Sequence, residues 1–285
     1  YRNTVYLATH NQTGQEMELK LETPIKTVNY PVKDFGEPLD LGIKLDYDFN
    51  FLAMAQFGPR KNLPNTVKWF IEEFQNDEVG LVVKTNIAKN CLMDREKLHH
   101  DMKGLMAQYP DRKCKVYLLH GDMTDKEIHS LFEHPQIKAF LTLTHGEGFG
   151  LPVFEAAYTG LPVIAPGWSG QLDFLVDKET GMSHFYNVEY DLQPIPENVV
   201  WAGVIIKESM WAYPREHSAK QQMRQCYAGL SSSSASKIID RAKEHADRLH
   251  QIFSEESQYA LMVSEVCETL QISSDISTEE VIEFK

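Results

Sequence analysis

The sequence predicts an α/β fold, a Rossmann-like parallel sheet with helices on both faces, followed by C-terminal helices. The first observation behind this prediction is an alternation of short apolar runs with amphipathic stretches from residue 49 to residue 168. The second is that five apolar runs are separated by four helical stretches, which implies a parallel sheet covered on both faces. In such sheets ligands lie beyond the carboxyl ends of the strands, and Gly-rich turns follow two of these runs.

The first half of the alternation gives two strands and two helices. The run "FNFLAMAQF" (49–57) predicts a buried strand, and "VGLVVKT" (79–85) predicts a second. Between them, "LPNTVKWFIEEFQ" (63–75) predicts a helix, because its large apolar side chains share one face and a proline falls in the first turn. The stretch "DREKLHHDMKGLMAQY" (94–109) predicts another helix, which a proline ends.

The second half of the alternation completes the predicted sheet. Three further runs predict strands: "CKVYLLHG" (114–121), "KAFLTLTH" (138–145) and "LPVIAPGW" (161–168). The stretch "TDKEIHSLFEH" (124–134) predicts a helix, because its threonine and the glutamate three residues later can form a capping box. The stretch "LPVFEAAYTG" (151–160) predicts a short helix that ends at a glycine.

The segments on either side of this alternation are less regular. Near the N-terminus only "IKTVNYPV" (25–32) has the composition of a strand. Toward the C-terminus, residues 215–230 and 236–270 predict helices, joined by a turn of four serines. We therefore divide the chain into a linker or domain remnant, a Rossmann-like domain, and a helical segment with a tail, at residues 1–48, 49–230 and 231–285.

Composition and charge exclude several classes of partner. The net charge of −13, without a run of Lys or Arg, disfavours binding to nucleic acid or to an anionic membrane. No apolar stretch approaches the ~20 residues needed to span a bilayer. The four cysteines are scattered without CxxC spacing, so we expect reduced thiols and a cytoplasmic protein.

The segment "THGEGFGLPVFEAAYTGLPVIAPGWSG" (144–170) places a carboxylate on each side of a Gly-rich turn. Gly148 and Gly150 allow positive φ angles and a close approach of the backbone to a ligand. The helix that follows presents free N–H groups and partial positive charge, which suit a phosphate. Glu155 lies about one helical turn further on, where it can accept hydrogen bonds from vicinal ribose hydroxyls. Glu147 is closer to the strand end, where a sugar hydroxyl or a developing positive charge would lie against it.

A tight strand-to-helix loop would by itself explain an isolated GxG, with glycine for geometry and glutamate for solubility. Here two glycines, two glutamates, a proline and a second Gly-rich turn, "GWSG" (167–170), occur together at successive strand ends. This combination favours a ligand site over a purely structural loop.

The stretch "HGEGFGLPVFEAAYTGLPVIAPGWSGQLDF" resembles the signature of the nucleotide-sugar-dependent glycosyltransferases of family 4, the retaining group with the GT-B fold. Glu147 and Glu155 match the family's Glu-x7-Glu motif, with "GFGLP" between them and "GLPVIA" after them. The upstream "FLAMAQFGPRKNLPNTVKWFIEEF" resembles the family's entry strand and helix. The resemblance covers roughly residues 49–176 and implies that 49–230 is the donor-binding, C-terminal half of a GT-B fold.

The resemblance also implies roles for single residues. Glu155 would bind the ribose hydroxyls of the donor nucleotide, and Glu147 would contact the donor sugar near the reacting carbon. For His145, at the end of the fourth strand, a catalytic and a structural role are both open. The other residues of the two Gly-rich turns would hold the sugar or the pyrophosphate, and the end of the third strand would flank the base: Gly148, Phe149, Gly150, Leu151, Ser169, Gly170, His120 and Gly121.

Cations are the remaining requirement of such a site. Lys61 would neutralise the diphosphate, and Arg60 or Lys84 would supply a second positive charge. Departure of a nucleoside diphosphate builds negative charge, which fixed cations and N–H dipoles stabilise without a metal. No Asp-x-Asp pair lies near the strand ends, so we expect no metal and no other cofactor. The expected substrates are a nucleotide-diphosphate sugar and an acceptor that the sequence does not identify.

Three features depart from the family pattern, the first being Asp173, near which the family often has the longer glutamate. The family often has Gly-Arg at the end of the first strand, where this chain has Ala55-Gln56. A GT-B enzyme also has two Rossmann-like domains, and residues 1–48, which begin with Tyr1, are too few for the one that binds the acceptor. We therefore expect the donor half of a retaining glycosyltransferase, with the N-terminal domain missing or on a partner chain. A non-catalytic nucleotide-sugar-binding module is the alternative, and an epimerase or phosphorylase of the same fold is a third interpretation.

The four tryptophans divide into two groups. We expect Trp69, Trp201 and Trp211 to be packing residues, because large aromatic side chains contribute most to a core when buried. Trp168 lies in the "GWSG" turn at a strand end, where contact with a ligand and packing beneath the loop are both open.

Overall fold

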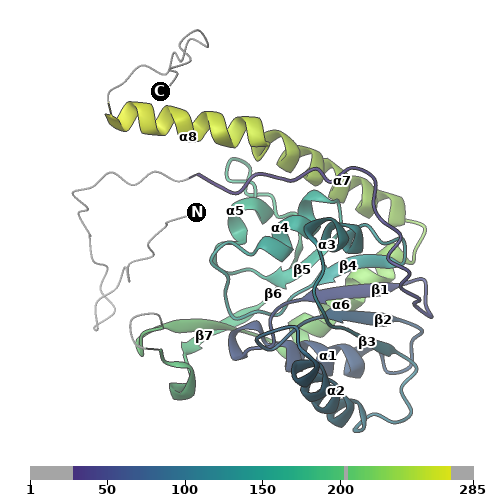
Figure 1. Cartoon of the computed structure of the whole chain (residues 1–285). Coiled ribbons are helices and arrows are strands. Elements are labelled where there is room, and N and C mark those ends of the chain that lie inside the picture. The colour runs from purple at the N-terminus through teal and green to yellow at the C-terminus, as the bar shows by residue number, and fades with distance from the viewer. Residues whose placement is uncertain (1–27, 202–204, 271–285) are drawn as a thin grey trace, which may run out of the picture. The chain divides into compact units, whose positions relative to one another are not determined.

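The computed structural model describes two compact units (Figure 1). The larger unit spans residues 34–249 and contains the whole central sheet. The smaller unit combines the two ends of the chain. In all, the structure describes residues 28–201 and 205–270.

A six-stranded parallel sheet forms the centre of the larger unit, with the order β3-β2-β1-β4-β5-β6 (Figure 1). The chain adds strands outward from β1 on one side and from β4 on the other, which is the order of doubly wound folds with a switch point between these two strands. The fold prediction is confirmed, and the first five strands are shorter than the predicted runs, with β4 beginning one residue before its run. The strands are β1 (Asn50–Met54), β2 (Gly80–Lys84), β3 (Lys115–Leu119), β4 (Ile137–Leu141), β5 (Val163–Pro166) and β6 (Tyr186–Val188).

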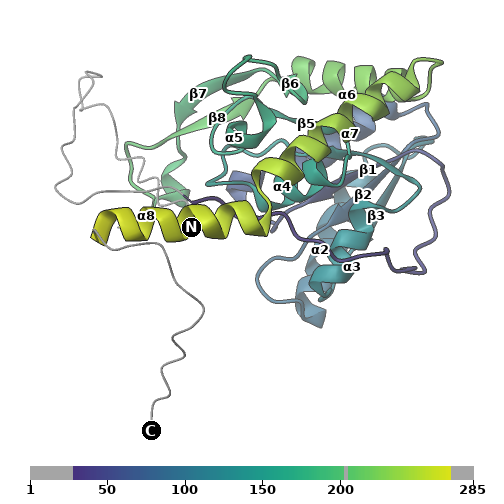
Figure 2. The same cartoon turned by 90° about the horizontal axis from the view of Figure 1, so that it is seen from above.

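Helices cover both faces of this sheet (Figures 1 and 2). Helices α1 and α6 contact each other on one face, and α3 and α4 contact each other on the opposite face. In the part of the chain that the structure describes, no helix is both long and apolar enough to cross a bilayer. The helices of the larger unit are α1 (Leu63–Phe74), α2 (Leu92–Met106), α3 (Asp125–Phe132), α4 (Leu151–Tyr158), α5 (Leu172–Leu175), α6 (Glu216–Leu230) and α7 (Ala235–Ile252), which continues into the smaller unit.

The predicted apolar face of α1 is the centre of the core. Val67, Phe70, Ile71 and Phe74 are all fully buried. The ring of Phe74 lies 5.5 Å from that of Phe51 on β1, in a tilted aromatic contact. Helix α3 begins with the predicted capping box, in which threonine and glutamate satisfy each other's backbone N–H groups. Local signals and burial thus agree along the first half of the chain.

Two strands after residue 188 and a break near the C-terminus were not predicted. Strands β7 (Tyr190–Pro194) and β8 (Met210–Pro214) form a separate antiparallel pair. The single helix predicted over 236–270 is two helices, α7 and α8 (Glu255–Leu270). The break between them is capped, because the hydroxyl of Ser254 accepts the N–H of the third residue of α8 at 3.1 Å.

Two further predictions about single segments are wrong. Residues 28–32, part of the run predicted as a strand, form no strand, and the rest of that run lies outside the described residues. Within the smaller unit the Val32 N–H instead donates to the carbonyl of Phe253 at 2.7 Å. Trp201, predicted to pack, is 66% exposed, whereas the other two tryptophans predicted to pack are buried.

The cysteines are free thiols, as their spacing predicted. Cys91 is exposed, and the other three are buried. Burial raises the pKa of the Cys114 thiol to about 11 and that of Cys226 to about 12. These two thiols are therefore protonated at neutral pH and act as small apolar side chains.

A stacked pair of histidines lies near the start of β6. The imidazoles of His184 and His245 are parallel within 4°, with centroids 4.1 Å apart. None of their four ring nitrogens has a hydrogen-bond partner in the described part of the chain. Burial, then the positive field of His184, Arg248 and Arg241, lowers the pKa of His245 to about 3. His245 is therefore neutral in the folded protein at pH 5, where it is protonated in the unfolded chain.

Replacing His245 with leucine is expected to make the protein less sensitive to acid. As pH falls from about 6.5 toward 3, the unfolded state binds a proton that the folded state does not, so the free energy of unfolding falls by ~1.4 kcal/mol per pH unit from this group. Urea unfolding between pH 7.5 and pH 5 should show a shallower decline for His245→Leu. The matched control, exposed His100→Gln, should keep the parental decline, and equal slopes in all three proteins would contradict the assignment.

Candidate functional site

The predicted site residues gather on one edge of the sheet. Because all six strands are parallel, the loops that follow them open on the same, carboxyl edge. The loop after β1 and the loop after β4 meet at the switch point, since these strands are neighbours. The residues on this edge, in strand order, are Arg60 and Lys61 after β1, Lys84 at the end of β2, His120 and Gly121 after β3, His145 to Leu151 after β4, and Ser169 and Gly170 after β5.

An ion cluster joins the two central loops. Lys61 Nζ lies 2.6 Å from Glu147 Oε1, and Arg60 Nη1 lies 3.2 Å from Glu147 Oε2. Arg60 also donates to the carbonyl of Gly146. The side chains of Lys61 and Glu147 are only 19% and 10% exposed, and burial lowers the pKa of Lys61 although Glu147 opposes this. The cluster holds two cations and one carboxylate, so it has a net positive charge.

The second Gly-rich turn fixes the backbone of Glu147. The Glu147 N–H donates to Ser169 Oγ at 2.8 Å, the same hydroxyl donates to the Glu147 carbonyl, and the Gly170 N–H reaches that carbonyl at 3.1 Å. A Cβ on Gly170 would lie 2.0 Å from the carbonyl oxygen of Gly148, so this position requires glycine. Ser169 and Gly170, predicted to bind donor, therefore hold the loop that presents Glu147.

Two features hold the loop after β4 in place: a buried aromatic side chain within it and the start of α4 that follows it. The ring of Phe149 is buried and packs 5.1 Å from Phe154 and 5.0 Å from Phe174. Gly150 adopts φ of +89° as the N-cap of α4, a conformation that favours glycine. Since the Phe149 side chain belongs to the core, a ligand at this loop would meet its backbone.

Glu155 lies on α4, in the turn after the one that begins at the loop. Its side chain is half-buried, and α4 starts with a proline in the first turn as predicted. The role of Glu155 toward a ribose stays a prediction.

Lys84 belongs to a second cluster, on β2 and β3. It is 9% exposed, and its ammonium group donates to the carbonyl of Gly121. Burial lowers the pKa of Lys84, and Asp122 opposes this. Next to it, His120 has a buried ring nitrogen, Nε2, without a partner in the described chain. The structure thus places Lys84 with the predicted base-flanking residues, whereas Arg60 and Lys61 lie with Glu147.

His145 is held as a structural element. Its N–H donates to the carbonyl of Arg60 at 2.8 Å, and its Nδ1 lies 2.8 Å from the carbonyl of Ala212 on β8. The ring is buried and stacks on Trp211 with centroids 5.4 Å apart. Burial lowers the pKa of His145, so the imidazole is neutral at pH 7 and Nδ1–H is the donor to Ala212. This geometry fits a positioning role, and the catalytic role stays a prediction.

Two contributors to this edge were not predicted from the sequence. Asn62 is 6% exposed, adopts φ of +54° and donates from Nδ2 to the Leu143 carbonyl at 3.0 Å, which ties the loop after β1 to β4. Asparagine after the Arg-Lys pair is the signal, because it tolerates this backbone conformation. Strand β8, which holds His145, is the second, and its sequence "MWAYP" has the aromatic alternation of a strand.

Trp168 is half-buried with its ring 5.6 Å from Tyr190, so contact with a ligand and packing beneath the loop both stay open.

Residues 48–187 match the family model of glycosyl transferases group 1. The matched segment contains the ion cluster, both Gly-rich turns and α4. This match supports the assignment of the segment to the group 1 glycosyltransferases, which the resemblance of the motifs also implied. No curated protein is similar enough to the chain to count as a match.

Solved structures share the fold at low sequence identity. A glycosyltransferase from Rickettsia africae ESF-5 matches with a TM-score of 0.54 and 16% identity, over 79% of this chain and 48% of its own. Sucrose-phosphate synthase from Thermosynechococcus elongatus matches with a TM-score of 0.53 and 18% identity, over 81% of this chain and 47% of its own. Anabaena HepE, in complex with UDP and glucose, matches with a TM-score of 0.50 and 12% identity, over 78% of this chain and 48% of its own. The chain therefore has the Rossmann-like architecture of GT-B glycosyltransferases and spans about half the length of these neighbours.

Proposed function

We propose that this chain is the donor-binding half of a glycosyltransferase that takes a sugar from a nucleotide-diphosphate sugar and transfers it with retention of anomeric configuration. The ion cluster of Arg60, Lys61 and Glu147 at the switch point is the observation that supports this most strongly. It combines cations for a diphosphate with a carboxylate for a sugar, next to the amino end of α4. The UDP and glucose bound to the Anabaena neighbour support the same class of donor.

The cluster suggests how the donor would bind. Glu147 occupies both cations in the structure, at 2.6 Å and 3.2 Å. A diphosphate has more negative charge than one carboxylate, so it would take over Lys61 and Arg60. Glu147 would then accept hydrogen bonds from the donor sugar, with its backbone still held by Ser169. The Glu147 carboxylate, which pairs with the two cations in the free protein, would thus bind the sugar in the complex.

The cations also bear on the chemical step. When the bond between the sugar and the diphosphate breaks, negative charge grows on the leaving oxygen, and Lys61, Arg60 and the N–H groups at the start of α4 would stabilise it. Fixed groups of this kind need no reorganisation during the reaction. We propose on this basis that catalysis is independent of a metal, and that activity persists in EDTA.

Replacing Glu155 with alanine is expected to weaken nucleoside diphosphate binding by about 10- to 100-fold, because two hydrogen bonds from ribose hydroxyls to a charged group are lost. Isothermal titration with UDP, GDP, ADP and dTDP measures this and identifies the preferred base. The matched control is Glu96→Ala, which removes an exposed carboxylate from α2 and should bind like the parent. If none of the four nucleotides binds at about 1 mM, the donor-site proposal is wrong.

We keep a second candidate function, a non-catalytic module that binds nucleotide sugar and assembles with another chain. The same ion cluster supports it, because its cations and carboxylate would bind a donor whether or not the sugar is then transferred. Incubation of the chain with a nucleotide sugar and an acceptor panel separates the two proposals. Transfer to an acceptor excludes the module, and nucleotide binding without transfer in the presence of any acceptor favours it.

A further inference from the structure

A cavity of about 520 Å³ lies at the opposite end of the sheet from the ion cluster. Pro162 and Val163, at the start of β5, and Tyr186, the first residue of β6, form part of its wall. The Gly-rich turns follow the carboxyl ends of β4 and β5 instead. None of the described residues that line this cavity, here called the α7 cavity, belongs to the ion cluster or to either Gly-rich turn, although Asn187 contacts Gly167 of the second turn.

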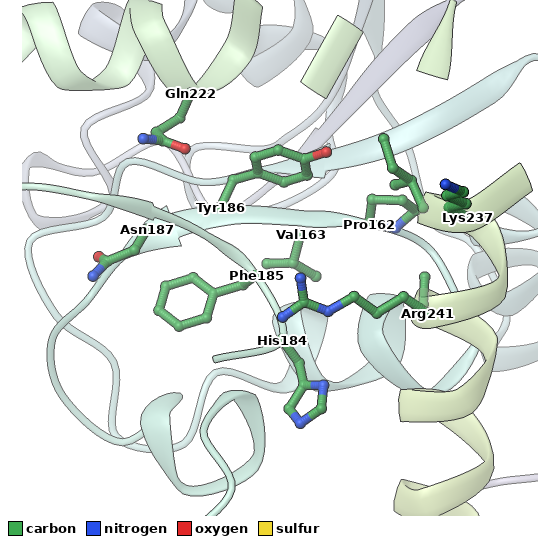
Figure 3. A pocket seen from close by; sticks show the side chains of 11 residues that line it. Pro162, Val163, His184, Phe185, Tyr186, Asn187, Gln222, Lys237 and Arg241 are labelled. Carbon is green, nitrogen blue, oxygen red and sulfur yellow. The ribbon is translucent and has the colours of Figure 1, made fainter. Parts of the chain in front are cut away.

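Two cations of α7 line this cavity (Figure 3). Lys237 and Arg241 are four residues apart and so share one face of the helix. Figure 3 shows Arg241 reaching from α7 toward His184 and Phe185. One N–H of Arg241 donates to the carbonyl of Ser183 at 2.6 Å, which holds the side chain in this position. Lys237 has no ion pair or side-chain hydrogen bond with any described residue.

The charge of the cavity is positive although the chain as a whole is acidic. The net charge of the chain is −13, yet none of the described residues that line the cavity is acidic. Asp177, whose charge acts on His184, is itself paired with Arg248 at 3.2 Å. After burial, the positive charges of Arg248 and Arg241 contribute to lowering the pKa of His184. The cavity thus presents two cations that no lining carboxylate neutralises.

The other walls suit a ring with hydroxyl groups. Phe185 and Tyr186 supply aromatic surface, and Tyr186 packs against the hydrophobic core cluster that includes Cys226. Gln222 from α6 brings an amide group to the cavity, whereas the Asn187 amide points away from Arg241 and lies against Gly167 (Figure 3). A cavity of this size, mostly apolar with a few polar groups, is within the range of small-molecule sites.

We propose that the α7 cavity binds a small phosphate monoester of a ring compound. The phosphate, close to a dianion at pH 7, lies between Lys237 and Arg241. The ring packs against Phe185, and its hydroxyl groups meet the amide of Gln222. Sugar phosphates and nucleoside monophosphates share this chemistry, and both are smaller than a nucleotide sugar. A ligand here would touch β5, β6 and α7 at once, and β5 leads directly into the turn that holds Glu147.

Titration calorimetry of the full chain at constant ionic strength tests this with three probes: glucose 6-phosphate, AMP and inorganic phosphate. At least one ester is expected to bind below about 1 mM, and more tightly than inorganic phosphate. Which ester binds distinguishes a sugar ring from a base. Lys237→Ala and Arg241→Ala are each expected to weaken binding about tenfold or more, because each removes a charge-assisted hydrogen bond to phosphate.

Two controls locate the ligand. Lys243→Ala removes the same charge from α7 outside the cavity and should change the affinity less than twofold. Glu155→Ala should leave ester binding intact, so this result is independent of the proposed donor site. The proposal is overturned if no ester binds at about 10 mM, if Lys237→Ala has no larger effect than Lys243→Ala, or if Glu155→Ala alone abolishes binding. If Arg241→Ala unfolds the protein, Lys237→Ala still tests the proposal, because the Lys237 side chain has no partner among the described residues.

Discussion

Replacing Lys61 with methionine is expected to weaken nucleoside diphosphate binding by about 10- to 100-fold. Methionine keeps the apolar stem of lysine and removes the ammonium group. That group lies 2.6 Å and 2.8 Å from the two oxygens of Glu147, on a side chain that is 19% exposed. A charge in such a partly dry position interacts with phosphate more strongly than one in water. Calorimetry with the preferred nucleotide measures the loss.

The opposite sign is expected for Glu147→Gln. If Glu147 competes with the diphosphate for Lys61 and Arg60, removing its charge frees both cations, and the nucleotide binds several-fold more tightly. Transfer of the sugar, where an acceptor allows it to be measured, should nevertheless fall, because the carboxylate next to the sugar is lost. A Glu147→Gln variant that binds nucleotide more weakly than the parent would show that the carboxylate contacts the nucleotide part of the donor and does not compete with it.

The same pair of variants tests whether the cluster stabilises the free protein. Each single change leaves a partly buried charge without its main partner, so the double variant should be more stable than the sum of the two single changes predicts, by about 1–3 kcal/mol. The control cycle is Lys97→Met with Asp101→Asn, an exposed pair on α2 at 2.8 Å, where the coupling should be below ~0.5 kcal/mol. Equal coupling in both cycles would mean that the cluster at the switch point is an ordinary surface pair.

The sequence predicted the first five strands because each is a short, mainly apolar run. The fold buries β1, β2, β4 and β5 on both faces, whereas β3, at the edge of the sheet, is half-buried. In β2, for example, all five residues are buried, so the run needs no alternating pattern to be found. Strand β6 lies at the edge of the sheet, has three residues and includes an exposed asparagine, so no apolar run marks it. Strand β7 has a proline and four exposed positions, and its pairing with β8 is set by contacts distant in sequence.

For the site, sequence spacing identified which residues face one edge but not which of them pair. Glu147 was placed against a sugar, whereas the free protein pairs it with Lys61 and Arg60 across 86 and 87 positions of sequence. Strand order decides this contact, because only the adjacency of β1 and β4 brings the two loops together. The same limit applies to Ser169. Its presence in a Gly-rich turn suggested a ligand contact, and its hydroxyl is engaged by the backbone of Glu147.

Replacing Gly170 with alanine is expected to reduce both stability and nucleotide binding more than any other change of a single methyl group at this edge. The added Cβ would lie 2.0 Å from the carbonyl oxygen and 2.7 Å from the carbonyl carbon of Gly148, and 3.2 Å from the carbonyl oxygen of Glu147. These are backbone atoms, so no side chain can turn away, and the two Gly-rich turns must separate. We expect a loss of about 2–4 kcal/mol in the free energy of unfolding.

Separation of the turns would also break the bonds that aim Glu147. The Gly170 N–H reaches the Glu147 carbonyl at 3.1 Å, and the Ser169 hydroxyl bonds to the same peptide group. Nucleotide affinity should therefore fall in Gly170→Ala even at temperatures where the variant is folded, and Ser169→Ala should lose less, because it removes the hydroxyl without a clash. The control is Gly104→Ala in α2, where a Cβ meets nothing within 4 Å and alanine favours the helix, so this variant should be as stable as the parent or more stable. Urea unfolding and calorimetry on the three variants decide the matter: a Gly170→Ala protein with parental stability and affinity would mean that the turns are not in the contact on which the proposed donor site depends.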